Sequence, residues 1–207
     1  MATTDRQTHW DTIHRTKGER EVSWFQEMPQ ASLDLIARCA LPPEAPIVDV
    51  GAGASRLVDA LLNAGHRDLT VLDISAEALA RSRERLGERA QAVQWVVADI
   101  TRWEPERQYA CWHDRAAFHF LTDPADRAAY VGRLSRALAP GGHAIIGTFA
   151  PEGPEQCSGL PVVRYSAVDL GELLGSDFEL VEHRTQDHET PWGTVQRFQM
   201  SRFERTA

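Results

Sequence analysis

Three aspartates stand at the ends of successive short apolar segments: Asp49 in PIVDV, Asp73 in DLTVLD and Asp99 in AVQWVVAD. Two glycines, Gly51 and Gly53, closely follow the first of these aspartates. Carboxylates accept hydrogen bonds from hydroxyl and amine groups, and a glycine backbone admits a ligand that a Cβ atom would hold off. These residue types at these positions indicate a site for a polar ligand, provided that the chain brings the segment ends together.

The elements that must position these residues alternate along the chain. Short β-branched runs that are apolar on both faces predict strands, and longer stretches with apolar residues three and four positions apart predict helices. Because crossovers between parallel strands are right-handed, this alternation predicts a doubly wound, mostly parallel α/β sheet with helices on both faces. We expect strands at 46–50, 68–73, 92–99, 109–114 and 143–149, and helices within 55–65, 75–87 and 123–142.

The flanking segments predict further elements. A helix is expected over 29–39, and a short helix within 166–175 follows a loop rich in Pro and Gly. The segments 178–189 and 194–205 flank a turn at Pro191–Gly193, which predicts an antiparallel hairpin. In a doubly wound sheet the ligand lies beyond the carboxyl ends of the strands, which is where the three aspartates fall.

The residues around the glycines restrict the chemistry of the ligand. Asp73 follows the glycines by about 20 residues, the spacing at which a carboxylate accepts from ribose hydroxyls, and Asp99 with Ile100 is placed to bind adenine. Arg56 stands where a dinucleotide loop keeps its third glycine, and Asp49 would repel a pyrophosphate. The same Asp49 suits a ligand with an ammonium group and a sulfonium cation, which describes S-adenosylmethionine.

Four motifs, VDVGAGAS, VLDIS, VVADI and LAPGGHAIIGTF, resemble those of class I S-adenosylmethionine-dependent methyltransferases over residues 45–150. The resemblance implies a Rossmann-like, seven-stranded sheet whose last two strands form an antiparallel hairpin. It also implies that the glycines lie against the methionine part of the cofactor. The expected cofactor-binding residues are Trp10, Asp49, Gly51, Ala52, Gly53, Ser55, Arg56, Asp73, Ile74, Ser75, Asp99, Ile100 and Asp114.

A narrower similarity is to methyltransferase-like lysine methyltransferases. It rests on HWDTIH and VSWFQ upstream, on GAGAS and on LDISAEALARSRER. The chain departs from that subgroup at His14, which replaces a tyrosine, and at Ala54, which replaces the loop asparagine. WHDRAAFHF also stands where the subgroup has Asp-Lys-Gly. These departures leave the inference of the cofactor intact and weaken that of a lysine substrate.

The acceptor side is expected at the end of the fourth strand and in the loop after the fifth. Methyl transfer is an in-line displacement, so positioning can suffice, and a base is needed only when the nucleophile must lose a proton. The candidate catalytic residues are Asp114, His113 and His119, and the candidate substrate residues are Phe118, His119, Cys157, Arg164 and Tyr165. Strand capping is the alternative role for His113, and packing is the alternative for His119 and Tyr165. Surface ion pairs are the alternative for Asp114 and Arg164.

Composition restricts the remaining possibilities. The net charge of −8, with Lys17 as the only lysine, disfavours a nucleic-acid surface. The three cysteines have no CxxC spacing, so no metal site and no disulfide framework are expected. We find neither the apolar core of a signal peptide nor the ~18 apolar residues of a spanning helix, so a cytoplasmic protein without a membrane partner is expected.

The expected organisation is one methyltransferase domain over 1–207, as a monomer or homodimer. Residues 1–40 would form an N-terminal lid or helical extension, and residues 150–176 a loop and helix on the substrate side. The predicted function is methylation of a small-molecule N, O or S nucleophile. The alternatives are a protein lysine methyltransferase, a non-catalytic S-adenosylmethionine-binding protein and a nicotinamide-dependent oxidoreductase.

Overall fold

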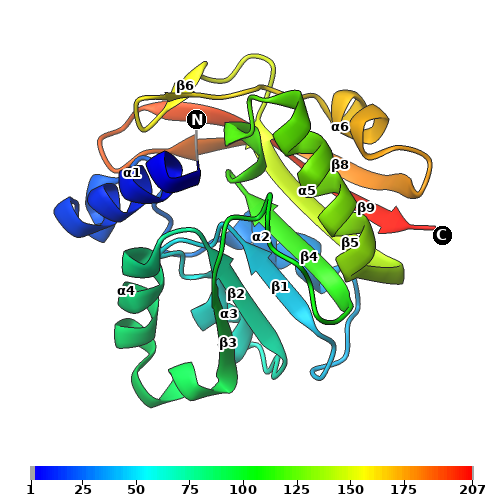
Figure 1. Cartoon of the computed structure of the whole chain (residues 1–207), viewed down its shortest axis with the longest axis horizontal. Helices are drawn as coiled ribbons and strands as arrows, with labels where there is room; N and C mark the ends of the chain where they lie inside the picture. Colours follow the sequence, from blue (N-terminus) through cyan, green and yellow to red (C-terminus); the bar gives the residue numbers. More distant parts are fainter. Residues whose placement is uncertain (1–2, 207) are drawn as a thin grey trace.

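The protein is built on one seven-stranded sheet with the strand order β3-β2-β1-β4-β5-β9-β8, in which only the pairings of β9 are antiparallel (Figure 1). The computed structural model describes residues 3–206, so residues 1–2 and 207 of the predicted domain lie outside the described part. This order confirms the predicted doubly wound sheet. Its strands are β1 (Ile47–Val50), β2 (Leu69–Asp73), β3 (Val93–Val97), β4 (Tyr109–Arg115), β5 (Leu138–Phe149), β8 (Phe178–Glu189) and β9 (Val195–Arg205).

Helices cover both faces of the sheet, with α5 in front and α2 behind it in Figure 1. None of the helices within residues 3–206 is both long enough and apolar enough to cross a membrane. The helices are α1 (Thr3–Thr16), α2 (Gln30–Ala37), α3 (Leu57–Asn63), α4 (Ala76–Leu86), α5 (Pro124–Ala137) and α6 (Ala167–Leu174), with 3₁₀ turns at η1 (Glu19–Glu21), η2 (Gly87–Ala92) and η3 (Phe118–Phe120).

Side-chain caps start three of these helices. The Ser75 hydroxyl accepts from the Ala78 N–H at the start of α4, and the Asp123 carboxylate accepts from Ala125 at the start of α5, where Pro124 is the first helical residue. Ser166 forms a capping box with Asp169 in α6. A cap supplies a partner for an otherwise unpaired N–H and typically contributes about 1 kcal/mol.

The strands bury alternate side chains in two separate cores, as a sheet covered on both faces requires. Ile47 and Val71 pack with residues of α2, α3 and α4 on one face. Val48 and Leu72 pack with residues of α5 and α6 on the other. Burial of each such side chain is worth about 1.5–3 kcal/mol, so both faces hold the strands of the central sheet in register.

The fifth strand begins earlier than the sequence pattern predicts. Helix α5 ends at Ala137, and Leu138 already has extended backbone and pairs with Tyr109 of β4. The helix predicted within 123–142, with Pro140 and the glycines as its stop, therefore ends three residues before Pro140. Pro140 explains the difference, because a proline drives the residue before it out of helical geometry and cannot continue a helix itself.

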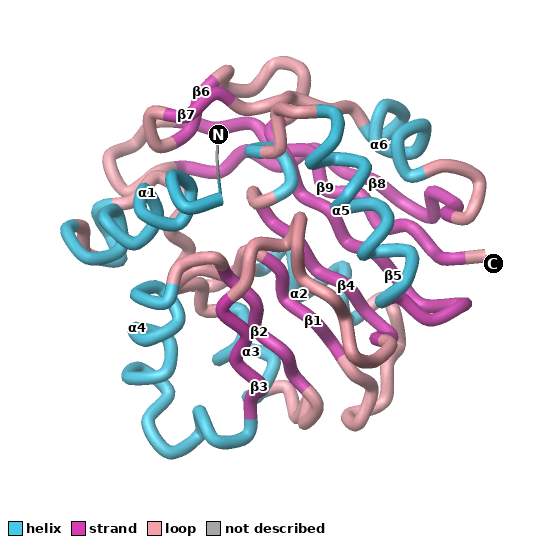
Figure 2. Tube along the Cα trace, in the orientation of Figure 1, coloured by secondary structure: helices cyan, strands magenta, loops and turns pink. Residues whose placement is uncertain are grey.

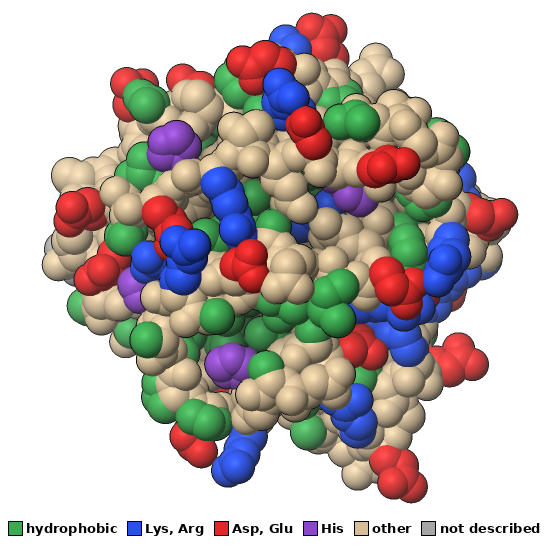
Figure 3. Space-filling view, turned by 180° about the vertical axis from the view of Figure 1, so that it is seen from behind, with side chains coloured by type: hydrophobic (Ala, Val, Ile, Leu, Met, Phe, Trp, Pro, Cys, Tyr) green, Lys and Arg blue, Asp and Glu red, His purple; other side chains and the backbone are tan. Residues whose placement is uncertain are grey.

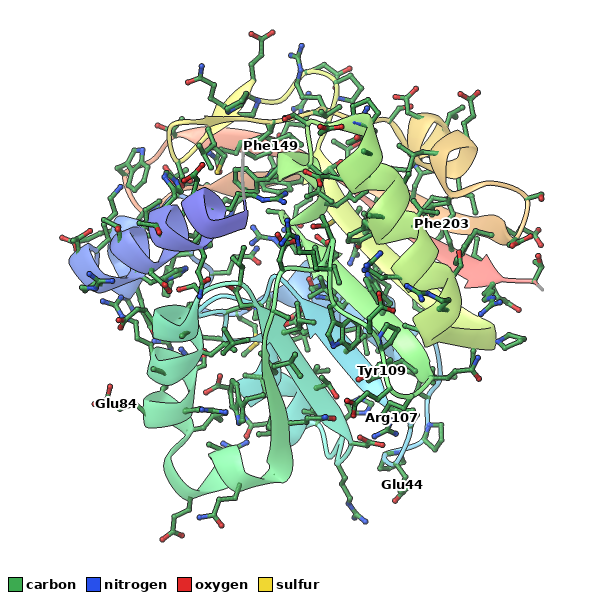
Figure 4. All side chains as sticks on the ribbon, in the orientation of Figure 1. Glu44, Glu84, Arg107, Tyr109, Phe149 and Phe203 are labelled. Atoms are coloured by element: carbon green, nitrogen blue, oxygen red, sulfur yellow. The ribbon has the colours of Figure 1, made fainter. Side chains whose placement is uncertain are left out.

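The carboxyl ends of the parallel strands lie toward α1. In Figure 4, Phe149 at the end of β5 lies near this edge, whereas Tyr109 at the start of β4 lies at the opposite one. Figure 2 shows α1 beside the short hairpin of β6 (Gln156–Cys157) and β7 (Leu160–Pro161). The predicted C-terminal hairpin is confirmed as β8 and β9.

Candidate active site

One cleft lies at the carboxyl ends of β1, β2 and β4, and Asp49, Asp73 and Asp99 all line it. Parallel pairing of β1 with β2 and of β2 with β3 brings the ends of three strands to the same edge of the sheet. Helix α1 and the chain that follows it cover the cleft with Trp10 and Trp24, which pack edge to face. The predicted convergence of the three aspartates is present in the structure.

The glycine loop is shaped by contacts within the protein. Gly51 has a φ of 64°, and a Cβ on it would lie 2.2 Å from the Cβ of Ala117, which is too close for any other residue type. Gly53 has a φ of 56°, and its N–H donates to Asp73 Oδ2 at 2.7 Å. The loop therefore presses against the end of β4 while it lines the cleft, and both positions need the left-handed backbone that glycine adopts readily.

Asp73 is held by backbone donors at the end of β2. Its Oδ1 accepts from the Ser75 N–H and its Oδ2 from the Gly53 N–H, both at 2.7 Å. Burial raises the pKa of Asp73 to about 6, although the two hydrogen bonds lower it. The carboxylate is therefore ionised at neutral pH and protonated in mild acid, with free lone pairs for further donors.

Asp99 is engaged by a residue that sequence analysis did not single out. Its Oδ1 accepts from the N–H and hydroxyl of Thr101, at 2.9 and 2.8 Å. Its Oδ2 accepts from Arg6 of α1 at 3.1 Å, and Arg6 also pairs with Asp126 of α5 at the same distance. Arg6 therefore ties α1 to the rim of the cleft beside the predicted adenine site.

Asp49 combines one satisfied oxygen with one that has no partner. Its Oδ1 accepts from His113 Nδ1 at 2.7 Å, and His113 Nε2 is hydrogen-bonded to the Ser32 hydroxyl at 2.8 Å. The buried Oδ2 of Asp49 has no hydrogen-bond partner among residues 3–206. A carboxylate oxygen in this state is suited to a cationic donor such as an ammonium group.

The structure corrects the two roles predicted for Asp114. Its side chain is fully buried and does not line the cleft. It accepts from the backbone N–H groups of Ala117 and Phe118 at 3.0 and 3.1 Å and from the Tyr130 hydroxyl at 2.9 Å. Successive side chains of a strand point to opposite faces, so Asp114 lies with the α5 core and fixes the turn after β4.

His119 is likewise a packed residue rather than a cleft residue. It is fully buried between Phe120 and Phe149, and its Nδ1 accepts from the Phe149 N–H at 3.3 Å. Burial lowers the pKa of His119 to about 3. The predicted catalytic and substrate roles of His119 therefore lack access to the cleft.

Four further predicted residues lie outside the cleft lining. Phe118 and Tyr165 are buried against each other in the core, and Arg164 bonds Glu155 and the Gly153 carbonyl. Ser75 is occupied as the cap of α4 and as a donor to Asp11. The cleft lining does contain the other predicted residues, namely Trp10, Ala52, Ser55, Arg56, Ile74, Ile100, His113 and Cys157.

The cleft also contains residues that sequence analysis missed. Arg6 and Arg115 line it together with Gln196 and Phe198 from β9. The position of Arg115 at the end of β4 is a signal for the cleft that residue type alone does not give. The approach of β9 depends on strand order, which no local pattern reveals. Among residues 3–206, no cluster of three or more His, Cys, Asp or Glu side chains is arranged to hold a metal ion.

Comparison with known proteins gives concordant matches. Residues 47–142 match a family model described as a methyltransferase domain. The chain is 33% identical over 114 residues to nodulation protein S of Rhizobium tropici, which covers 55% of this chain and 47% of that protein. It is 30% identical over 135 residues to trans-aconitate 2-methyltransferase of Sinorhizobium medicae, which covers 64% of this chain and 47% of that protein.

The chain thus spans about half the length of the curated relatives that it matches. Among solved structures, the N-methyltransferase NodS from Bradyrhizobium japonicum in complex with S-adenosyl-L-homocysteine superposes with a TM-score of 0.74. The superposition covers 96% of this chain and 99% of that chain at 19% identity, a likeness that shows a shared fold.

Proposed function

Because residues 47–142 match a methyltransferase-domain family model and the cleft suits an adenosyl ligand, we propose that the chain transfers a methyl group from S-adenosylmethionine to a small-molecule nucleophile. The observation that carries this proposal is the unpartnered Oδ2 of Asp49, buried beside the glycine loop in the cleft that Asp73 and Asp99 also line. A buried anionic oxygen without a donor calls for a cationic ligand group, and the methionine ammonium supplies one.

The remaining parts of the cofactor fit the same cleft. Asp73 would accept from the ribose hydroxyls, and Asp99 from the adenine amine, with the Ile100 N–H as a backbone donor. A dinucleotide fits less well, because its diphosphate would face the negative charge of Asp49 across the glycine loop. The rings of Trp10 and Trp24, which cover the cleft, would shield the adenosyl group from water.

When bound, S-adenosylmethionine supplies a sulfonium methyl group that passes to the acceptor as the sulfur becomes a neutral thioether. The task of the protein is then to align the acceptor with the methyl group and to exclude water. The histidines fit the role of a general base poorly. His113 has both nitrogens hydrogen-bonded, and burial lowers the pKa of His14 to about 4. We infer that the acceptor binds with its nucleophile already unprotonated.

A small molecule is the better-supported acceptor because of the charge that lines the cleft at the end of β4. A protein lysine substrate would favour an acidic groove, whereas this part of the cleft carries Arg115 beside the apolar ring of Phe198. The names of the relatives reported above include an enzyme for trans-aconitate, which agrees with a small acceptor.

Transfer of a labelled methyl group tests the proposal. The purified protein is incubated with methyl-labelled S-adenosylmethionine and a cell extract separated by size into protein and metabolite fractions. Label should appear in the metabolite fraction, and Asp49→Asn should reduce it at least tenfold while the exposed Asp187→Asn leaves it unchanged. Label in the protein fraction would instead support the lysine alternative, and cofactor binding without any transfer would support a non-catalytic binder.

A further inference from the structure

Arg115 ends β4 at the cleft, and the cofactor as placed above gives it no task. Its Nη1 donates to the Trp24 carbonyl at 3.1 Å, and its guanidinium lies over the ring of Phe198 at 4.9 Å from the centroid. Its Nη2 is buried and has no hydrogen-bond partner among residues 3–206. Arg115 thus lines the cleft with a guanidinium whose Nη2 donors are unused.

The positive charge of Arg115 is also without a direct counter-charge. No carboxylate of the described chain forms an ion pair with it, in contrast to Arg6 and Arg85, which pair with Asp99 and Asp59. Burial lowers the pKa of Arg115 to about 10, so the guanidinium stays protonated at neutral pH.

The two acidic groups nearest in effect, Cys157 and Asp49, do not neutralise the charge of Arg115. Burial raises the pKa of the Cys157 thiol, which is therefore neutral at neutral pH. Asp49 attracts Arg115 from a greater distance, but its own hydrogen bond is to His113. A desolvated cation without a counter-charge is costly, and an anion that binds it recovers a large part of that cost.

A second buried polar group points to a ligand at the same place. Gln196 lies two residues before Phe198 on β9, so both side chains project from the same face of that strand. Both are buried and line the cleft, and Gln196 Oε1 has no hydrogen-bond partner within residues 3–206. We call Arg115, Cys157, Gln196 and Phe198 the acceptor end of the cleft.

The strand order separates the acceptor end from the residues assigned to adenosine. Asp73 ends β2 and Asp99 follows β3, whereas Arg115 and Gln196 belong to β4 and β9, on the other side of β1. A ligand group at Arg115 therefore lies beyond the glycine loop as seen from the adenosine, on the side toward which the methyl group would be passed.

We propose that Arg115 binds a carboxylate of the methyl acceptor, so that the substrate is a small organic acid with an apolar or aromatic body. This inference rests on the proposed function. A carboxylate fits better than a phosphate, because the acceptor end offers one guanidinium and a ring wall rather than several cationic donors. The other source of a carboxylate is the methionine part of the cofactor, and the experiment separates the two.

The test compares matched acids and amides on the protein saturated with S-adenosylhomocysteine. Phenylacetate and 3-phenylpropionate, with phenylacetamide and 3-phenylpropionamide, are titrated by calorimetry. Each pair shares size and shape and differs in charge. We expect at least one acid to bind tenfold or more tightly than its amide. Equal binding within both pairs, or no binding of either acid, would overturn the proposal.

Variants then assign the charge preference to one residue. Arg115→Gln should reduce the preference for the acid to twofold or less and change the affinity for S-adenosylhomocysteine by less than threefold. Arg115→Lys should keep part of the preference. Arg164→Gln, which removes a guanidinium paired with Glu155 outside the cleft, should behave as the wild type.

The opposite pattern would identify the other carboxylate. A tenfold loss of affinity for S-adenosylhomocysteine in Arg115→Gln, with the preference for the acid unchanged, would place the cofactor carboxylate on Arg115 and refute the proposal. Thermal unfolding of each variant checks the fold, and the wild-type acid and amide comparison decides the question even if Arg115→Gln does not fold. Failure of the wild type to bind S-adenosylhomocysteine would refute the proposed function instead.

Discussion

At the residue scale, environment gives the same side chain different tasks. Asp49, with one unpaired oxygen, faces the cleft, whereas Asp114 has donors on both oxygens and holds the turn after β4. The two residues lie on neighbouring strands, where Asp49 pairs with His113 and Val50 with Asp114. A shift of one residue along the strand therefore separates a carboxylate that lines the cleft from one that is buried in the core.

Replacement of Asp73 tests the ribose assignment. Asp73→Ala removes two ligand hydrogen bonds to an ionised acceptor and should weaken the binding of S-adenosylhomocysteine by ~1–3 kcal/mol. Calorimetry measures this loss, with Asp187→Ala as the control, because Asp187 is exposed and pairs with Arg197 on the far hairpin. An unchanged affinity in Asp73→Ala would contradict the assignment of the ribose to this carboxylate.

The pH dependence of binding gives a second test at Asp73. Its pKa is raised to about 6 in the free protein, and ribose hydroxyls donate best to the ionised form. Affinity for S-adenosylhomocysteine should therefore be constant between pH 7 and 8 and fall up to tenfold per pH unit below 6. Titrations of the wild type and Asp73→Asn measure this, and the same fall in the variant would assign it to another group.

Sequence identified the three cleft aspartates because each one lies at or close to the end of a strand, and strand ends converge in a parallel sheet. It did not identify Arg115 or Gln196, and it overvalued Asp114, His119, Arg164 and Tyr165. The cause is physical: residue type and spacing fix the edge of the sheet that a side chain reaches, but the neighbours of that side chain depend on packing between distant segments.

At the element scale, side-chain contacts hold α1 over the cleft. Arg6 bridges Asp99 and Asp126, and Asp11 accepts from the Ser75 hydroxyl at 2.6 Å. The predicted N-terminal extension of 1–40 is thus helical where it crosses the cleft, and its role as a lid remains a proposal. Cofactor entry would require at least one of these contacts to open.

Release of the first contact tests this role. Arg6→Ala should increase deuterium uptake over residues 3–16 in the free protein and speed the dissociation of S-adenosylhomocysteine. The reason is that α1 loses its ion pairs with Asp99 and Asp126. Hydrogen exchange and stopped-flow competition measure the two effects. Arg15→Ala is the control, since Arg15 lies on the exposed side of α1 and pairs with the exposed Glu77 of α4. Uptake equal in both variants would argue against a latch at Arg6.

The glycine loop allows a prediction about the fit between β1 and β4. Gly51→Ala would place a Cβ 2.2 Å from the Cβ of Ala117 at a φ of 64°. Overpacking and left-handed strain together should lower the free energy of unfolding by about 3 kcal/mol. Chemical denaturation measures the loss. Gly65→Ala has a φ of 94° but open space around the added Cβ, so it should show the strain alone, about 1 kcal/mol. Equal losses in the two variants would contradict the contact with Ala117.

The order of elements was predictable because each one carries its own signal. Ser75, Asp123 and Ser166 cap the predicted helices, and the turn at Pro191–Gly193 joins the predicted last strands. The early start of β5 was missed because the pairing of Leu138 with Tyr109 is a long-range contact without a local signature.

At the whole-molecule scale, buried histidines and buried aspartates have opposite effects on the stability of the fold as pH falls. Burial lowers the pKa of His14 to about 4 and that of His119 to about 3, so these histidines bind protons more readily in the unfolded chain and destabilise the fold as pH falls below 6.5. Asp73 and Asp114, with pKa values raised to about 6, act in the opposite direction between pH 6 and 4. On the face shown in Figure 3, acidic and basic side chains are interspersed.

Removal of one histidine tests this balance. At pH 5, about 1.5 units below the pKa of a free histidine, His119 is protonated in the unfolded chain but not in the fold. This difference should lower the free energy of unfolding by ~2 kcal/mol relative to pH 7. His119→Gln should remove that part of the acid sensitivity, whereas His183→Gln, at an exposed position of β8, should not. Urea denaturation at pH 5 and 7 measures the difference. An unchanged pH dependence in His119→Gln would show that His119 is not buried in its neutral form.

Calorimetric titration of the wild-type chain with S-adenosylmethionine and with NAD tests the central claim most directly. The account predicts saturable binding of S-adenosylmethionine in the cleft of Asp49, Asp73 and Asp99, lost in Asp49→Asn, and no binding of NAD. Binding of NAD in preference to S-adenosylmethionine, or binding of neither, would contradict it.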